Sequence, residues 1–73
     1  MTYFRCLYTL DSSVLKAAAY STDETLLLEF RTGPVYRYFR VPPTIFQDLM
    51  TATSKGAYYN RNIRKSFPYQ RVA

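Results

Sequence analysis

Two segments with the alternating pattern of β-strands, residues 25–31 and 35–41, flank the turn Thr32-Gly33-Pro34. Large apolar side chains recur at every second position of the first segment, which is the period of a strand with one buried face. Gly33 supplies the positive φ that such turns need, and Pro34 cannot donate a hydrogen bond inside a ladder. The sequence therefore predicts an antiparallel β-hairpin.

The second segment of this hairpin leaves two interpretations open. Tyrosines alternating with arginines are typical of a surface that stacks nucleic-acid bases, and also of a small core filled by tyrosine. A register that pairs Phe30 with Tyr36 places Tyr36 and Tyr38 on one face with large apolar side chains. The same register places Glu29 directly opposite Arg37. We therefore expect both tyrosines to face the core and Arg37 to point away from it.

The N-terminal part of the chain predicts two further strands. Residues 3–10 are rich in strand-forming side chains and are expected to form a short strand or an extended arm, ended by Asp11-Ser12-Ser13. Residues 15–21 are a second candidate strand, closed by the turn-prone residues 21–24. Three consecutive alanines in this candidate strand also suit a helix, which is the alternative there.

The C-terminal part of the chain predicts two helices. Pro42-Pro43 ends the hairpin, and Pro43 suits the opening of a helix whose apolar spacing runs over residues 45–53. Gly56 is expected to lie just past the C-terminus of this helix. Residues 57–65 predict a second helix, followed by an extended tail over residues 69–73.

These elements together predict an α+β fold. A small antiparallel β-sheet of three to four strands, built on the central hairpin, is expected to carry the two C-terminal helices on one face. Residues 1–11 are expected to form an N-terminal strand or arm, and residues 12–73 a single domain. A chain of 73 residues is near the lower limit for one core without disulfides or metals, and an aromatic content of 18% helps because aromatic side chains bury much area.

The residue types disfavour catalysis. The chain has no histidine, and its five carboxylates fall in predicted turns or on outward faces instead of in a close pair. The single cysteine, Cys6, cannot form an internal disulfide, and a small apolar role suits it better than that of a nucleophile. Two glycines do not make a phosphate-binding loop. We expect a non-enzymatic domain with no cofactor and no metal.

The sequence also predicts a cytoplasmic protein without a membrane segment. No apolar run approaches the ~18–20 residues that span a bilayer. The N-terminus lacks the long apolar stretch of a signal peptide.

Positive charge is concentrated in the last third of the chain. Residues 1–48 carry five basic and five acidic side chains, whereas residues 49–73 carry five basic side chains and no acid, which accounts for the net charge of +5. Such a segment either binds a polyanion or forms a solvated face, and the charge alone does not decide between the two. If an anion or nucleic acid binds, the candidate residues are Lys55, Arg61, Arg64, Lys65, Arg37, Arg40, Tyr58 and Asn60.

A set of spaced motifs resembles the KTSC domain family. The motifs are Ser12-Ser13, Tyr20, Leu26-x-Leu28-x-Phe30-x-x-Gly33-x-x-Tyr36-x-Tyr38-x-x-Val41-Pro42, Leu49, Ser54-Lys55-Gly56-x-Tyr58-Tyr59-Asn60-x-x-Ile63-Arg64 and Tyr69. The resemblance covers residues 12–72 and assigns structural positions to Gly33, Tyr36, Tyr38, Pro42, Gly56, Tyr59 and Ile63. Tyr59 stands where the family often has phenylalanine, and Thr32-Gly33-Pro34 replaces the more usual acidic-glycine turn.

The resemblance implies a bacterial or phage protein, because the family is named for a C-terminal extension of some lysyl-tRNA synthetases and also occurs as small stand-alone proteins. By that association it implies RNA binding, with no established activity. Together with the segregated charge, it predicts a module that binds RNA or single-stranded nucleic acid through the basic C-terminal helix. The alternative is a protein-interaction module, an adaptor or inhibitor that docks on an acidic partner or self-associates. The N-terminal arm suits that role because it is able to pair at a sheet edge. The sequence does not determine the oligomeric state.

Overall fold

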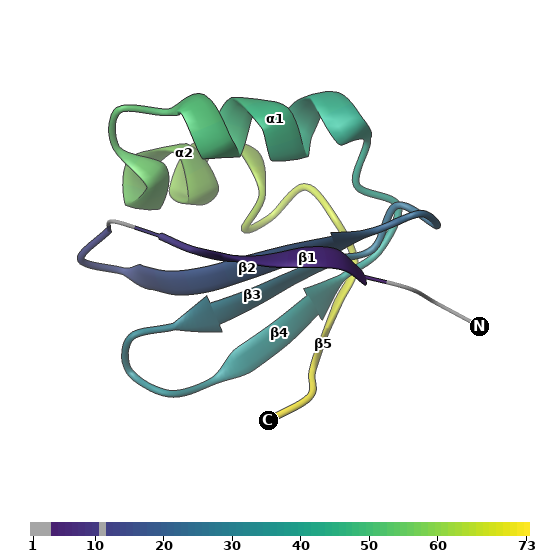
Figure 1. Ribbon diagram of the computed structural model, residues 1–73, viewed down its shortest axis with the longest axis horizontal. Coiled ribbons are helices and arrows are strands. Elements are labelled where there is room, and N and C mark those ends of the chain that lie inside the picture. The colour runs from purple at the N-terminus through teal and green to yellow at the C-terminus, as the bar shows by residue number, and fades with distance from the viewer. Residues whose placement is uncertain (1–3, 11) are drawn as a thin grey trace.

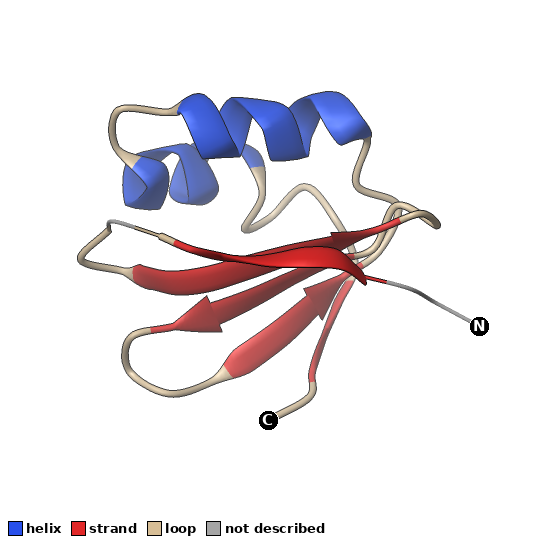
Figure 2. Cartoon of the chain, in the orientation of Figure 1, coloured by secondary structure: helices blue, strands red, loops and turns tan. Residues whose placement is uncertain are grey.

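A computed structural model describes the backbone of residues 4–10 and 12–73 and the side chains of residue 10 and residues 12–73. Among the described residues, one antiparallel sheet has the strand order β1-β2-β3-β4-β5, and α1 and α2 lie together on one of its faces (Figures 1 and 2). This architecture confirms the predicted α+β fold. The elements are β1 (Phe4–Thr9), β2 (Leu15–Ser21), β3 (Leu26–Phe30), β4 (Val35–Tyr38), α1 (Pro43–Thr51), α2 (Lys55–Asn62) and β5 (Tyr69–Arg71).

The sheet has five strands, where three to four were predicted. The N-terminal segment pairs as β1 with β2, with an irregularity between Phe4 and Leu7, so most of the predicted arm is part of the sheet. The C-terminal segment, predicted as an extended tail, forms a further strand: β5 pairs with β4 and places Tyr69 opposite Tyr38. Some predictions for the N-terminal segment fall outside the described residues. They concern Met1, Thr2, Tyr3, Asp11 and the side chain of Cys6.

The predicted register of the central hairpin was wrong by two residues. Leu28 lies opposite Tyr36, and Leu26 opposite Tyr38. The shift arises in the turn, where Phe30 N donates to the Pro34 carbonyl (2.9 Å), so that Phe30 pairs with Pro34. Because side chains alternate between the faces of a strand, a shift of two leaves every side chain on its predicted face.

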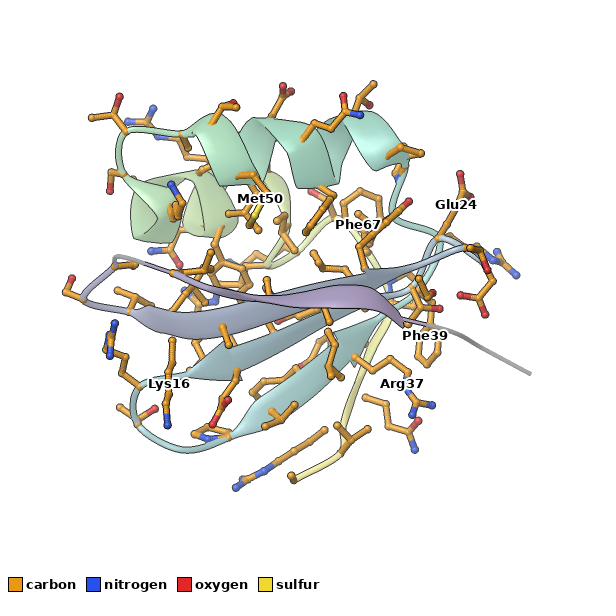
Figure 3. All side chains as sticks on the ribbon, in the orientation of Figure 1. Lys16, Glu24, Arg37, Phe39, Met50 and Phe67 are labelled. Atoms are coloured by element: carbon orange, nitrogen blue, oxygen red, sulfur yellow. The ribbon has the colours of Figure 1, made fainter. Side chains whose placement is uncertain are left out.

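The predicted ion pair between Glu29 and Arg37 was also wrong as a result of this shift. Arg37 lies opposite Leu27, and Glu29 opposite Val35. Glu29 instead pairs with Lys16, with 3.8 Å between Lys16 Nζ and Glu29 Oε2. This pair lies on the face of the sheet that the helices leave uncovered, where Figure 3 also shows Arg37. The expectation that Arg37 points away from the core is confirmed.

Both hairpin turns around β3 use the same three-residue loop. Gly33 N donates to Phe30 O (2.9 Å) in one, and Glu24 N donates to Ser21 O (3.3 Å) in the other. The third loop residue has positive φ in each, +116° at Gly33 and +65° at Glu24. This backbone conformation explains why a glycine stands at position 33.

Gly33→Ala is expected to lower the free energy of unfolding by about 1–2 kcal/mol, the cost of left-handed backbone for a residue with a Cβ. An added Cβ would meet no heavy atom within 4 Å, so backbone strain is the whole effect. Urea denaturation measures the change. Glu24→Gly at the equivalent position is the control and should be neutral or stabilising. A Gly33→Ala variant as stable as the wild type would contradict this account of the turn.

The core lies between the helices and the sheet. Tyr20 links the two layers, because its ring stacks on Phe46 of α1 with centroids 4.8 Å apart and its hydroxyl donates to the Val41 carbonyl (2.5 Å). No helix among the described residues is long and apolar enough to cross a membrane. The side chains with less than 2% of their surface exposed include Leu15, Leu26, Leu28, Val41, Leu49 and Ile63.

The second helix begins earlier than predicted. Gly56 does not end α1, which stops at Thr51; it lies inside α2, whose N-cap Ser54 accepts a hydrogen bond from Ala57 N. A Cβ on Gly56 would lie 2.9 Å from Val14 Cγ2, so the glycine allows α2 to approach the β1–β2 connection closely. Gly56 and Tyr59 on α2, and Ile63 just after it, are buried on one side, as predicted.

Candidate functional site

Five aromatic side chains from β3, β4, β5 and α2 form a closed cycle of ring contacts. Most of the neighbouring rings meet edge to face, a favourable geometry for aromatic pairs. The cluster runs from the core to the surface, because Tyr38 is 2% exposed and Tyr69 is 60% exposed. The centroid distances are Phe30–Tyr36 5.7 Å, Tyr36–Tyr69 5.7 Å, Tyr69–Tyr38 5.7 Å, Tyr38–Tyr59 6.0 Å and Tyr59–Phe30 5.2 Å.

The buried end of this aromatic cluster is joined by a hydroxyl pair. Tyr38 Oη lies 2.5 Å from Tyr59 Oη, and the two share a hydrogen bond. Burial, and then the hydrogen bond to Tyr59, raise the pKa of Tyr38 far above its ordinary value of 10.0. Tyr38 is therefore an uncharged, fixed support for the rings nearer the surface.

The aromatic cluster lines an open groove of about 690 Å³. This volume lies within the ~300–1,000 Å³ typical of small-ligand sites. Among the described residues, no carboxylate lines the groove, and two cations do. Figure 3 shows one further lining residue, Phe67, between the helices and the sheet. The remaining lining residues are Val14, Thr32, Pro34, Asn60, Arg64 and Lys65.

The two cations are held by the turn that follows α2. The Tyr59 carbonyl accepts hydrogen bonds from Ile63 N (3.0 Å) and Arg64 N (2.9 Å), and the Ile63 side chain is fully buried. Further along, Phe39 N donates to the Pro68 carbonyl (2.9 Å) and fixes the entry to β5. The backbone that carries Arg64, Lys65 and Tyr69 is therefore anchored at both ends.

Three of the candidate residues predicted from the sequence meet at this groove: Asn60, Arg64 and Lys65. Arg64 and Lys65 were expected on a helix but lie just beyond α2, which ends at Asn62. Lys55 and Arg61 are on α2 and do not line the groove. Lys55 Nζ donates to the Ala52 carbonyl at the end of α1 (3.1 Å), a contact that links the two helices.

The other three candidates lie elsewhere. Arg37 is on the opposite face of the sheet (Figure 3), and Arg40, with φ of +60°, is in the connection between β4 and α1. Tyr58 is half-buried; burial raises its pKa, and the charge of Asp48 and a hydrogen bond to that carboxylate raise it further. The structure therefore does not gather all eight candidates into one surface.

Nine of the lining residues were not predicted as binding residues, Tyr36 and Tyr69 among them. Tyr38 is buried as expected, but Tyr36 is only half-buried and lines the groove. Tyr69 was interpreted as part of a tail, and its exposed ring completes the aromatic cluster. All three residues of β5 are exposed, so no apolar alternation could have identified this strand. No group of three or more His, Cys, Asp or Glu in the described part of the chain is placed to hold a metal ion.

Comparisons with known proteins agree with the motifs. The family model described as the KTSC domain matches residues 11–67. A lysine–tRNA ligase of Nostoc punctiforme is 39% identical over 64 residues, which are 86% of this chain and 11% of the ligase. A protein of Tsukamurella paurometabola is 40% identical over 58 residues, covering 78% of this chain and 87% of that protein. The chain thus spans about a tenth of the ligase it matches and nearly all of the small relative.

A solved structure shows the same architecture. The crystal structure of a KTSC domain protein from Yersinia pestis matches with a TM-score of 0.89 and 26% sequence identity, covering 93% of this chain and 97% of that one. The family match covers more than half of the chain, and the fold, the motifs and the relatives agree with it. The chain belongs to the KTSC domain family.

Proposed function

We propose that this protein binds RNA or single-stranded nucleic acid through the aromatic groove and the cations at its rim. The observation that carries the proposal is the placement of Arg64 and Lys65 beside a cluster of aromatic rings, with no carboxylate among the described lining residues. Cations neutralise phosphates, and aromatic rings stack unpaired bases, so the two together suit a nucleic-acid strand.

The relatives support the same proposal. Lysine–tRNA ligases, by their name, act on tRNA, and this domain makes up about a tenth of one of them. A domain joined to such an enzyme would add contacts to RNA. We propose that the present chain also contacts RNA and that it does so in the cytoplasm.

A binding role also fits the arrangement of the acidic side chains better than catalysis does. Glu29 pairs with Lys16 on the uncovered face of the sheet, and Asp48 interacts with Tyr58. Asp23 and Glu24 lie in the turn between β2 and β3, where Figure 3 shows Glu24 at one end of the molecule. None of these carboxylates lines the groove, so none is placed at the rings to act as a general acid or base.

Fluorescence anisotropy of a labelled single-stranded RNA at rising salt tests the proposal. We expect Lys65→Ala to weaken binding and to reduce the slope of log affinity against log salt by about 0.7, the share of one phosphate contact on a single strand. The Arg64→Ala/Lys65→Ala double variant should lose about twice that slope. Arg61→Ala, outside the groove lining, should have a smaller effect.

Lys16→Ala is the matched control, since it also removes one lysine but on the opposite face of the sheet (Figure 3). An equal loss of affinity in Lys16→Ala and Lys65→Ala would show that only net charge matters. Absence of RNA binding at low salt would overturn the proposal.

A second candidate function is docking on a protein partner. The observation that favours it is Leu27 of β3, a half-buried apolar residue on the face of the sheet that the helices leave uncovered. β1 pairs with β2 at the edge of the sheet, so the arm on which this alternative was partly based pairs with the protein's own sheet. A partner recovered in stoichiometric amount after nuclease treatment, and lost in Leu27→Asp, would favour it over nucleic-acid binding.

A further inference from the structure

We propose that the groove binds an unpaired nucleotide, whose base stacks on Tyr69 and whose neighbouring phosphate contacts Arg64 and Lys65. This inference rests on the proposed nucleic-acid binding and goes further, because it names the stacking residue and restricts the ligand to unpaired strands. It assigns the central role to Tyr69, which lies beyond the residues matched by the family model.

The ring of Tyr69 is supported from inside the molecule and open on its other side. It lies 5.7 Å from the Tyr38 ring at an interplanar angle of 36°, and 5.7 Å from the Tyr36 ring at 78°. Two rings therefore contact Tyr69 from within the molecule. Because Tyr69 is nevertheless 60% exposed, much of its surface is open to a ligand.

The supporting rings hold Tyr69 in a fixed orientation. Tyr38 is 2% exposed and is tied to α2 by its hydroxyl bond to Tyr59. The β4–β5 pairing places Tyr69 directly opposite Tyr38 on the sheet. A ring fixed in this way loses little conformational freedom when a base stacks on it, which favours binding.

Polar groups around the rings suit the rest of a nucleotide. Arg64 and Lys65 are exposed at the same groove and are able to contact a phosphate. The Asn60 side chain also lines the groove and is exposed. Its amide is therefore available to donate to, and accept from, the edge of a base.

Stacking on Tyr69 requires a base with an uncovered face, and this restricts the ligand to unpaired nucleotides. In a duplex each base is covered above and below by its neighbours, so a protein ring has no base face to contact. In a single strand, a loop or a bulge, a base is able to turn out and stack on an aromatic side chain.

Proline-rich peptides also bind grooves lined with aromatic side chains. The two cations, with no carboxylate in the described lining, favour a phosphate-bearing ligand over such a peptide. An acidic proline-rich peptide is therefore included in the test as a competitor.

The test compares three labelled probes by anisotropy in low salt: decauridylate, a ten-residue abasic strand with the same phosphates, and a ten-base-pair RNA duplex. We expect the decauridylate to bind about 5- to 150-fold more tightly than the abasic strand, the range for loss of one stacked base. Tyr69→Ala should reduce the affinity for decauridylate to that for the abasic strand, and Tyr69→Phe should retain it. Thermal melts confirm that both variants are folded.

The possible outcomes distinguish base stacking on Tyr69 from nucleic-acid binding through charge alone. If decauridylate and the abasic strand bind equally well and Tyr69→Ala has no effect, stacking is refuted and binding through charge alone remains. Duplex binding as tight as that of the single strand would also overturn the inference. If no probe binds, both proposals fail. A peptide that binds more tightly than decauridylate and displaces it would assign the groove to a protein ligand instead.

Discussion

Leu49→Ala is expected to lower the free energy of unfolding by about 2–5 kcal/mol, the range for removing a buried leucine side chain. Leu49 is fully buried and is the one residue of α1 in that class. A domain of 73 residues has a total stability of roughly 4–11 kcal/mol. The substitution would therefore remove a large share of it, and guanidinium denaturation followed by circular dichroism measures the loss.

Two controls accompany this substitution. Leu49→Met nearly conserves volume and should cost less than about 1.5 kcal/mol. Met50→Ala removes a neighbouring apolar side chain of α1 that is only half-buried, so its cost should be smaller than that of Leu49→Ala. Equal losses in Leu49→Ala and Met50→Ala would show that Leu49 is not the main attachment of α1 to the core.

The sequence predicted the faces of the hairpin better than its register. Leu26, Leu28 and Tyr38 are all buried, as predicted. The face of a strand on which a side chain lies depends only on whether its position is odd or even, so a register error of two residues does not change it. The register was judged partly from an expected pair between Glu29 and Arg37. An exposed ion pair contributes at most about 1 kcal/mol, too little to outweigh the hydrogen bonding of the turn. The loop geometry therefore determined the register.

The candidate site was only partly readable from the sequence. Charge segregation identified Arg64 and Lys65, because net charge along a chain needs no knowledge of the fold. The role proposed for Tyr69 depends on the pairing of β5 with β4, a contact between segments about thirty residues apart. A strand of three exposed residues has no apolar period to reveal it. The placement of Arg37 on the far face follows from strand alternation and was predicted.

The buried tyrosines predict a loss of stability in alkaline solution. An unfolded tyrosine releases its proton near pH 10.0, whereas the pKa of Tyr38 in the folded protein is raised by burial and by its bond to Tyr59. Above pH 10 the unfolded state therefore binds fewer protons than the folded state, and the free energy of unfolding falls as pH rises. Tyr38 alone contributes about 1.4 kcal/mol per pH unit in this range. The contribution of Tyr38 to the free energy of unfolding is fully present below pH 10 and is lost as the pH rises above that value.

Two further tyrosines also have raised pKa values and should add to the loss of stability above pH 10. Burial raises the pKa of Tyr20, with the charges of Glu24 and Asp23 adding to the effect, and burial and Asp48 raise that of Tyr58. Urea denaturation between pH 9 and pH 11 should therefore show a fall steeper than one tyrosine gives. Comparison with a variant that lacks the buried hydroxyl pair isolates the contribution of Tyr38.

The variant is Tyr38→Phe/Tyr59→Phe, which removes both hydroxyls of the buried pair. Tyr38→Phe alone leaves the Tyr59 hydroxyl without its partner and should cost about 1–3 kcal/mol at pH 7. The double variant leaves no unpaired group, so it should be more stable than the single one at pH 7 and should lose less stability between pH 10 and pH 11. A double variant with the same alkaline slope as the wild type would show that Tyr38 is ionised in the folded protein at that pH.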